Sequence, residues 1–240
     1  MSEKSVNLGN KLLAALPKAE YERLLPHLEP IALPFKKILF LPNEPIEYVY
    51  FIYTGAASML MTLEGGGVIE VATVGNEGML GTPVLLGGNQ LPVETIIQIP
   101  GEGVRMKAEV FKRVVIPGSV THNLLMRYIQ ALMNQAMQTA ACNRLHSVEE
   151  RCSRWLLMTR DRVESDEFPL TQEFLSDMLG VRRATVSVAA SVLQKAGLIS
   201  YHRGMMKIID RQGLESASCE CYRVLNQEYK RLLESPFRVR

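Results

Sequence analysis

The most constraining feature of the sequence is segment 171–199, which predicts two short helices joined by a tight turn. Leu175, Met178 and Leu179 give the first helix an apolar face, and Gly180 stands where the turn is needed. The second helix has its own apolar positions, namely Val186, Ala189, Ala190 and Leu193. Both faces can be buried in one small core, which leaves the start of the second helix exposed.

That exposed start carries basic and hydroxyl side chains, which are Arg182, Arg183, Thr185 and Ser187. Such side chains at a helix N-terminus can reach base edges in the major groove of DNA. The segment from residue 178 to residue 211 contains six basic residues and one acidic residue. Its net charge is therefore +5, whereas the whole chain carries only +2. The pattern predicts a DNA-binding helix-turn-helix, and a solvated basic face is the alternative.

Length and composition limit the remaining classes of protein. The chain has 240 residues, of which 47% are hydrophobic, enough for one large core and two smaller ones. No apolar run approaches the roughly 18 residues that a membrane span requires, and the N-terminus lacks a signal-peptide pattern. We therefore expect a cytoplasmic protein without membrane contact. No nucleophile elbow, phosphate-binding loop or zinc-protease helix is found, so an enzyme is the least supported class.

The first half of the chain changes character near residue 31. Residues 7–29 have helix-like leucine spacing, with Pro17 opening a second short helix. From about 31 to 110, short runs rich in Val, Ile, Tyr and Phe alternate with Gly, Pro and Asn; the clearest runs are 48–53, 68–74 and 94–99. Strands of this length and spacing predict a compact antiparallel β barrel or roll.

A long helix is predicted over residues 119–145, about 40 Å in length. One small barrel cannot cover a helix of this length, so we expect it to pair with the same helix of a second subunit as a parallel coiled coil. The alternative is a helix packed wholly within one chain. The predicted dimer interface comprises Leu125, Tyr128, Ile129, Leu132, Met133, Ala136 and Ala140.

Residues 144–147 are predicted to be a hinge, because Ser147 and Glu150 form a capping-box pattern that starts a fresh helix through about Val163. Residues 163–169 are expected to be a loop. Two short strands turning at Arg203-Gly204 follow the helix-turn-helix as a winged hairpin, and residues 214–233 are helical again. The fold class is thus α+β, with domains at 1–118, 119–146, 147–213 and 214–240.

This order of elements resembles the Crp/Fnr family of bacterial transcription regulators. The resemblance is most specific at residues 179–186 and 193–199, and it is supported by 48–55 and 74–81 in the roll. It implies a homodimer that binds a palindromic site in double-stranded DNA and contacts RNA polymerase. It also implies an effector in the roll that shifts the long helices and reorients the DNA-reading heads.

The resemblance assigns DNA contacts residue by residue. Arg183 matches a guanine-reading arginine, Thr185 a contact to phosphate or a thymine methyl, and Thr171 and Gln172 the phosphate-facing start of the first motif helix. Ala184 and Val188 stand where the family often has a base-reading glutamate and a second arginine, so the target sequence should differ from the best-known consensus. Further DNA contacts are expected from Arg182, Ser187, Ser191, Arg203 and Lys207.

The family's cyclic-nucleotide pocket corresponds here to residues without the required chemistry. The matching positions are Met79, Leu80, Pro92, Val93, Ala136 and Met137. No Arg or Lys lies between Glu64 and Pro100, so a cyclic phosphate would have no positive partner, at a cost of several kcal/mol. We expect control by an unidentified apolar or weakly polar ligand, or no effector, rather than by cyclic AMP or cyclic GMP.

The four cysteines leave two interpretations open. Cys142 and Cys152 flank the hinge, and Cys219 and Cys221 form a Cys-x-Cys pair, whereas no cysteine precedes residue 142, unlike in Fnr-type iron–sulfur regulators. The favoured interpretation is four reduced thiols, with no metal ligands and no cofactor. The alternative is a redox- or metal-responsive regulator that uses Cys219 and Cys221. A different class, a protein-interaction module without specific DNA binding, also remains open.

Overall fold

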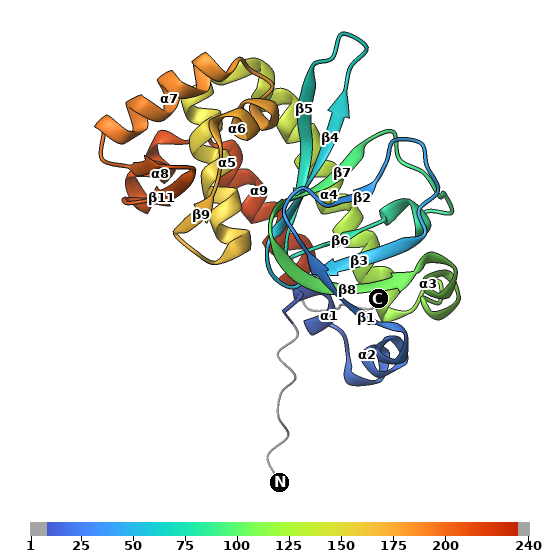
Figure 1. Ribbon diagram of the computed structural model, residues 1–240. Coiled ribbons are helices and arrows are strands. Elements are labelled where there is room, and N and C mark those ends of the chain that lie inside the picture. Colours follow the sequence, from blue (N-terminus) through green and yellow to red (C-terminus); the bar gives the residue numbers. More distant parts are fainter. Residues whose placement is uncertain (1–8, 235–240) are drawn as a thin grey trace.

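The computed structural model describes residues 9–234, so the predicted helical positions 7 and 8 lie outside the described residues. Figure 1 shows a strand-rich N-terminal part and a helical C-terminal part, with the long helix α4 (Val120–Leu145) running from one to the other. The α+β fold class predicted from the sequence is confirmed.

The strand-rich part is a roll of two four-stranded antiparallel sheets. The sheet orders are β1-β8-β3-β6 and β2-β7-β4-β5. The strands are β1 (Glu29–Leu33), β2 (Ile38–Phe40), β3 (Tyr48–Ile52), β4 (Ala56–Thr62), β5 (Val68–Val74), β6 (Met79–Leu80), β7 (Glu94–Ile99) and β8 (Gly101–Lys107). The three strand runs expected from the sequence become β3, β5 and β7. Their inward side chains, such as Val49, Val74 and Ile97, are fully buried.

Short helices close the ends of the roll. They are α1 (Lys11–Ala14), α2 (Lys18–Leu24), a 3-10 turn at Leu25–His27, another at Thr82–Val84, and α3 (Ala108–Val114). Pro17 precedes α2 as expected, but Glu29 already belongs to β1, so the N-terminal helical region ends earlier than predicted. The buried Asn10 caps α1 and donates hydrogen bonds to the carbonyls of Ile52 and Gly78, which fixes α1 on the roll.

One face of α4 is buried against the roll, and another is exposed to solvent. Leu125, Tyr128 and Leu132 belong to the core of the roll, and Ile129 is 6% exposed. These four residues were predicted to form the dimer interface, and that assignment is wrong because their own chain already buries them. Of the predicted interface, the exposed residues are Met133, Ala136 and Ala140.

The structure has a break between two helices at the predicted hinge, and the helix predicted after it is confirmed. His146 has an extended backbone that ends α4, and Ser147 starts α5 (Val148–Val163). Ser147 Oγ accepts the Glu150 N–H, and Ser147 N donates to Glu150 Oε2, which completes the capping box.

The helix-turn-helix and the sheet that follow α5 are defined here, together with α5, as the reading head (residues 147–210). It contains α6 (Gln172–Leu179), α7 (Arg183–Lys195), and a sheet of order β10-β11-β9 made by β9 (Glu167–Pro169), β10 (Ile199–His202) and β11 (Met205–Ile208). Gly180 has φ of +61° at the turn between α6 and α7, a conformation that glycine adopts without steric cost. The loop expected at 163–169 ends in β9, a three-residue strand that pairs with β11.

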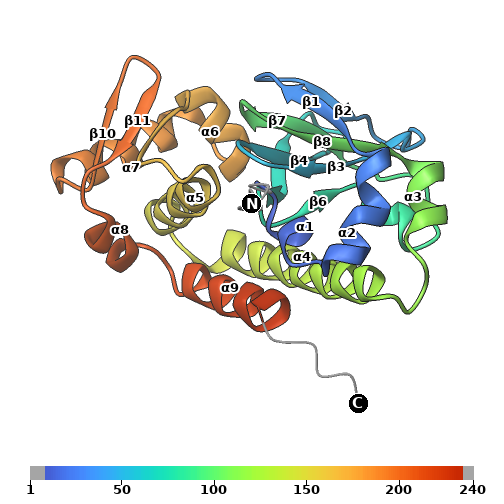
Figure 2. The ribbon, with the colours of Figure 1, turned by 90° about the horizontal axis from the view of Figure 1, so that it is seen from below.

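A helical extension completes the described chain. It consists of α8 (Arg211–Ala217), α9 (Cys221–Tyr229) and a π-helical turn at Lys230–Glu234. Figure 2 shows α9 lying along α4, on the side opposite the sheets of the roll. Asn134 donates to Glu228 Oε2, and Tyr229 donates to Gln135 Oε1, so polar contacts join the two helices. No helix within residues 9–234 combines the length and apolar character needed to cross a bilayer.

Candidate nucleic-acid interface

The start of α7 presents its basic side chains to solvent on a firmly packed helix. Arg182 is the N-cap residue and Arg183 the first helical residue, and both are exposed, as is Thr185. The opposite face of α7 is anchored in the core by Val186, Ala189 and Leu193, which are 0–3% exposed. The structure therefore places the predicted base-reading side chains together on one rigid helix tip.

Two of the predicted DNA-contacting hydroxyls already have partners within the motif. Thr171 Oγ1 accepts the Phe174 N–H and caps α6. Ser187 Oγ donates to Gln172 Oε1 at 2.6 Å, so this pair also ties α7 to α6. Gln172 and Ser187 thus lie next to each other, and their hydrogen bond links the two helices of the motif.

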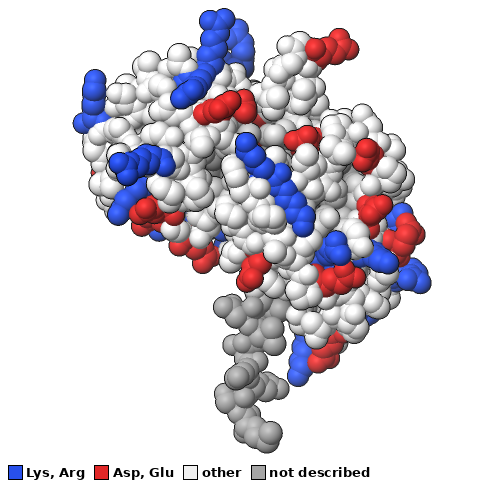
Figure 3. Space-filling model, in the orientation of Figure 1, with Lys and Arg blue, Asp and Glu red and all other residues white. Residues whose placement is uncertain are grey.

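The remaining predicted contacts surround the helix tip. Ser191 is exposed one turn beyond Ser187. Arg203 lies at the tip of the wing with φ of +48°, and Lys207 on β11 is exposed, with a loose 3.8 Å ion pair to Glu167. Figure 3 shows Lys and Arg side chains projecting from the margin of the molecule that α7 forms in this view. Positive charge at such a margin is what contacts to the phosphates of DNA require.

The residues at the family's cyclic-nucleotide positions do not line one cavity. Met79, Leu80 and Val93 are 0–5% exposed within the roll, whereas Pro92, Ala136 and Met137 are exposed on the surface. The space beside β6 is filled by Tyr128, which is 0% exposed and donates a hydrogen bond to the Met79 carbonyl at 3.0 Å. These six positions, which lack the chemistry for a cyclic nucleotide, thus do not line one pocket, and the side chain of Tyr128 closes the roll beside β6.

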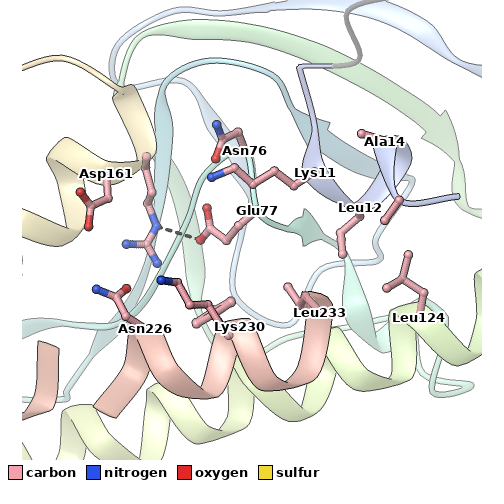
Figure 4. Close-up of a pocket in the computed structure, with 13 residues that line it drawn as sticks. Lys11, Leu12, Ala14, Asn76, Glu77, Leu124, Asp161, Asn226, Lys230 and Leu233 are labelled. Carbon is pink, nitrogen blue, oxygen red and sulfur yellow. Dashed lines mark hydrogen bonds and ion pairs between the residues drawn. The ribbon is translucent and has the colours of Figure 1, made fainter. Parts of the chain in front are cut away.

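A different cavity, of about 560 Å³, lies where five distant segments of the chain meet. Figure 4 shows side chains from α1, loop 76–77, α4, α5 and the C-terminal extension converging on it. Its lining combines charged side chains (Lys11, Glu77, Asp161, Arg162 and Lys230) with apolar ones (Leu12, Leu124 and Leu233). Sequence reasoning missed this cavity, because no local motif links residues so far apart.

The reading head docks on the roll through a buried carboxyl group. Glu70 on β5 accepts the Trp155 indole N–H at 3.0 Å and lies 2.5 Å from Ser58 Oγ, which also contacts Gln98 Oε1. Burial raises the pKa of Glu70, and hydrogen bonds from Ser58 and Trp155 oppose that effect only in part. The Ser58 hydroxyl has one proton, but it lies beside two acceptor oxygens, Glu70 Oε2 and Gln98 Oε1. If Glu70 is protonated, it donates to Ser58 Oγ and Ser58 donates to Gln98, so that each oxygen has a hydrogen-bond partner.

Glu70→Gln is therefore expected to leave the protein folded and to raise its stability at pH 7 to 8. A carboxyl group with a raised pKa stabilises the folded state at low pH, and that contribution is lost as the pH rises through the folded-state value. Each unit by which the pKa is raised corresponds to about 1.4 kcal/mol. Urea unfolding between pH 5 and pH 8 should show a smaller pH dependence for E70Q than for the wild type; an unchanged dependence would contradict this assignment.

The cysteines fall into two environments. Cys152 lies in the core of the reading head, where burial raises its pKa to about 12, so it is an unreactive packed thiol. Cys142, Cys219 and Cys221 form a separate buried cluster beside His146. A hydrogen bond from Cys219 lowers the pKa of Cys142 to about 5, against the effect of burial. The sequence pointed to the Cys219-x-Cys221 pair but not to its meeting with Cys142 and His146.

Comparison with known proteins agrees with this architecture. Residues 150–217 match the family model described as the Crp-like helix-turn-helix domain. A search of curated protein sequences gives no match. Among solved structures, FixK2 from Bradyrhizobium japonicum is similar with a TM-score of 0.68 and 19% identity, over 80% of this chain and 98% of that one.

Two further structures show the same fold. A CRP-family transcriptional regulator from Thermus thermophilus matches with a TM-score of 0.66 and 19% identity, over 79% of this chain and 96% of that one. The c-di-GMP-responsive regulator CLP from Xanthomonas campestris matches with a TM-score of 0.64 and 15% identity, over 81% of this chain and 100% of that one. Residues 150–217 are thus a Crp-like helix-turn-helix domain, carried by a chain with the fold of the Crp/Fnr transcription regulators.

Proposed function

We propose that this protein is a sequence-specific DNA-binding transcription regulator that acts as a homodimer on a palindromic site. The observation that carries the proposal is the tip of α7, where Arg182, Arg183 and Thr185 are exposed on a helix whose other face is buried. An arginine at this place can donate two hydrogen bonds to guanine N7 and O6, and the wing residues Arg203 and Lys207 can bind the flanking phosphates.

The dimer is supported by an exposed stripe on α4. Met126, Met133 and Met137 are 39%, 58% and 61% exposed, although they are large apolar side chains. With Gln130, Ala140 and Arg144 they follow alternating steps of four and three residues, the spacing of a coiled-coil seam. We define these six residues as the α4 seam. A second α4 packed against it would cover the face that neither the roll nor α9 covers.

The two subunits would present two α7 tips to one face of the duplex, so the target is expected to consist of two-fold-related half-sites. Tyr128 fills the place beside β6, and this argues against control by cyclic AMP or cyclic GMP. The mixed polar and apolar cavity of Figure 4 offers a different place for a small ligand. Contact with RNA polymerase is expected by analogy with the family.

Selection of bound duplexes from a random pool tests the proposal and gives the site with its half-site spacing. With that site, Arg183→Ala is expected to weaken specific binding by about 1–3 kcal/mol, or roughly 5- to 150-fold, because a bidentate contact to guanine is lost. Binding to random duplex should weaken much less. Fluorescence anisotropy titrations at several salt concentrations measure both affinities.

Arg113→Ala is the matched control. Arg113 is an exposed arginine on α3, and its removal changes the net charge by the same amount. Equal losses for R183A on specific and random duplexes would make Arg183 a phosphate contact only. A wild-type protein without any salt-dependent affinity for duplex DNA would instead support the protein-interaction alternative.

A further inference from the structure

Four potential metal ligands meet where the C-terminal extension touches the end of the long helix. Cys142 lies in the last turn of α4, His146 follows that helix, and Cys219 and Cys221 lie at the junction of α8 and α9. One donor atom from each residue lies within 4.8 Å of all the others. Residues separated by more than 70 positions in the sequence thus form one compact group.

The spacing of the donor atoms matches a single tetrahedral ion. With Zn–S bonds of about 2.3 Å and Zn–N bonds of about 2.0 Å, a tetrahedral site places two sulfurs about 3.8 Å apart, and a sulfur and a nitrogen about 3.5 Å apart. Here Cys142 Sγ and Cys219 Sγ are 3.5 Å apart, and Cys221 Sγ and His146 Nδ1 are 3.6 Å apart. Small adjustments would bring all four donors to bonding distance from a common centre.

The groups around the donors are those that a metal site needs. His146 turns Nδ1 toward the sulfurs, while its Nε2 lies 3.2 Å from Glu220 Oε2. A carboxylate on the outer ring nitrogen selects the tautomer that leaves the inner nitrogen free to bind a metal. Gln138 Nε2 also donates a hydrogen bond to Cys221 Sγ at 3.0 Å. Ordinary packing of thiols does not require either of these polar contacts.

The charges around the buried cluster are also suited to a bound divalent metal ion. Three thiolates, a neutral imidazole and a divalent cation carry one net negative charge, which needs compensation inside a protein. Arg151 and Arg154 on α5 are 6% and 5% exposed, and the charge of Arg154 acts on Cys142. The Nε atoms of both arginines are buried without a hydrogen-bond partner. Two incompletely paired guanidinium groups thus lie beside the cluster.

We propose that Cys142, His146, Cys219 and Cys221 bind one zinc ion in a tetrahedral Cys3His site that fastens the C-terminal extension to the end of α4. Three thiolates with an imidazole are a common donor set for structural zinc. Four donors within 4.8 Å leave room for one ion and not for a cluster of several irons and sulfides. A disulfide between Cys142 and Cys219 would use only two of the four donors.

The position of the site means that a bound ion would connect the long helix to the C-terminal extension. Cys142 and His146 lie on the long-helix side of the hinge, whereas Cys219 and Cys221 follow the wing of the reading head. An ion bound by all four would close a loop of the chain that contains the whole reading head. It would thereby restrict the angle between the head and α4 independently of any effector, so the site goes beyond the proposed DNA binding and does not depend on it.

Metal analysis of full-length protein purified under reducing, oxygen-free conditions tests the proposal. We expect one zinc per chain in the wild type and in the Cys152→Ser control, and less than a tenth of that in Cys142→Ser and Cys221→Ser. Replacement of zinc by cobalt should give the intense visible bands of a tetrahedral ion and a thiolate-to-cobalt charge-transfer band. This spectrum is recorded on the wild type, so it decides the question even if the serine variants fold poorly.

Chelation provides a second readout. A strong zinc chelator should lower the melting temperature of the wild type and of C152S, and zinc should restore it. Wild-type protein that is free of zinc and gives no tetrahedral cobalt spectrum would overturn the proposal, as would recovery of iron and sulfide. A Cys142–Cys219 disulfide found by mass spectrometry under these conditions would also overturn it. None of these measurements involves DNA, so they succeed or fail separately from the proposed function.

Discussion

Met133→Glu is expected to separate the homodimer into monomers and to abolish tight binding to the palindromic site. Met133 is 58% exposed at the middle of the α4 seam, where two copies would meet across the two-fold axis. Two opposed carboxylates would have to leave water there, at a cost of several kcal/mol. The dimer dissociation constant should rise by roughly 100-fold or more, about 2.7 kcal/mol. Analytical ultracentrifugation and DNA titration measure the two effects.

Leu86→Glu is the matched control for this variant. Leu86 is also 58% exposed, but it lies in a surface turn of the roll and not on α4. L86E should therefore remain dimeric and should bind DNA like the wild type. Circular dichroism should show unchanged helix content for both variants. An M133E protein that remains dimeric at low micromolar concentration would show that the two-fold axis does not run along this face of α4.

Local signals explain why the elements of the reading head could be predicted from the sequence. The capping box at Ser147, the left-handed glycine at Gly180 and the turn at Arg203-Gly204 are each encoded by a few neighbouring residues. The exposed position of Arg182 and Arg183 follows directly from the apolar spacing of α7. These predictions depend on short-range geometry, and the structure confirms the elements they describe.

Predictions that depended on which neighbour covers a surface were less successful. The sequence correctly predicts that Leu125, Tyr128, Ile129 and Leu132 of α4 are buried, but their spacing does not distinguish a second subunit from the roll of the same chain. Leu125 and Tyr128 proved to be part of the roll core, and the exposed methionines define the seam instead. Likewise, the sequence contained Cys142, His146, Cys219 and Cys221, but only the packing of α9 on α4 brings their donor atoms together.

Arg162→Met is expected to cost about 3–5 kcal/mol of folding free energy, because it breaks a buried ion pair and leaves one charge uncompensated. The Arg162 side chain is 8% exposed and lies 2.8 Å from Glu77 Oε1. It also donates to the carbonyls of Met158 and Thr73 and to Gln135 Oε1. One guanidinium group thus joins α5, the roll and α4. Urea unfolding monitored through Trp155 measures the loss.

Two further variants show whether this loss reflects the buried charge rather than the missing side-chain volume. Arg160→Met, on the same helix, removes an ion pair with Asp166 that is partly exposed to water, and it should cost 1 kcal/mol or less, as is usual for surface pairs. Glu77→Gln combined with Arg162→Met removes both charges and should recover a large part of the stability lost in R162M alone. If the double variant were no more stable than R162M, the loss would come from packing. If R162M were as stable as R160M, the head would not depend on this contact to stay docked on the roll, and the hinge at residues 144–147 would be free to move without breaking it.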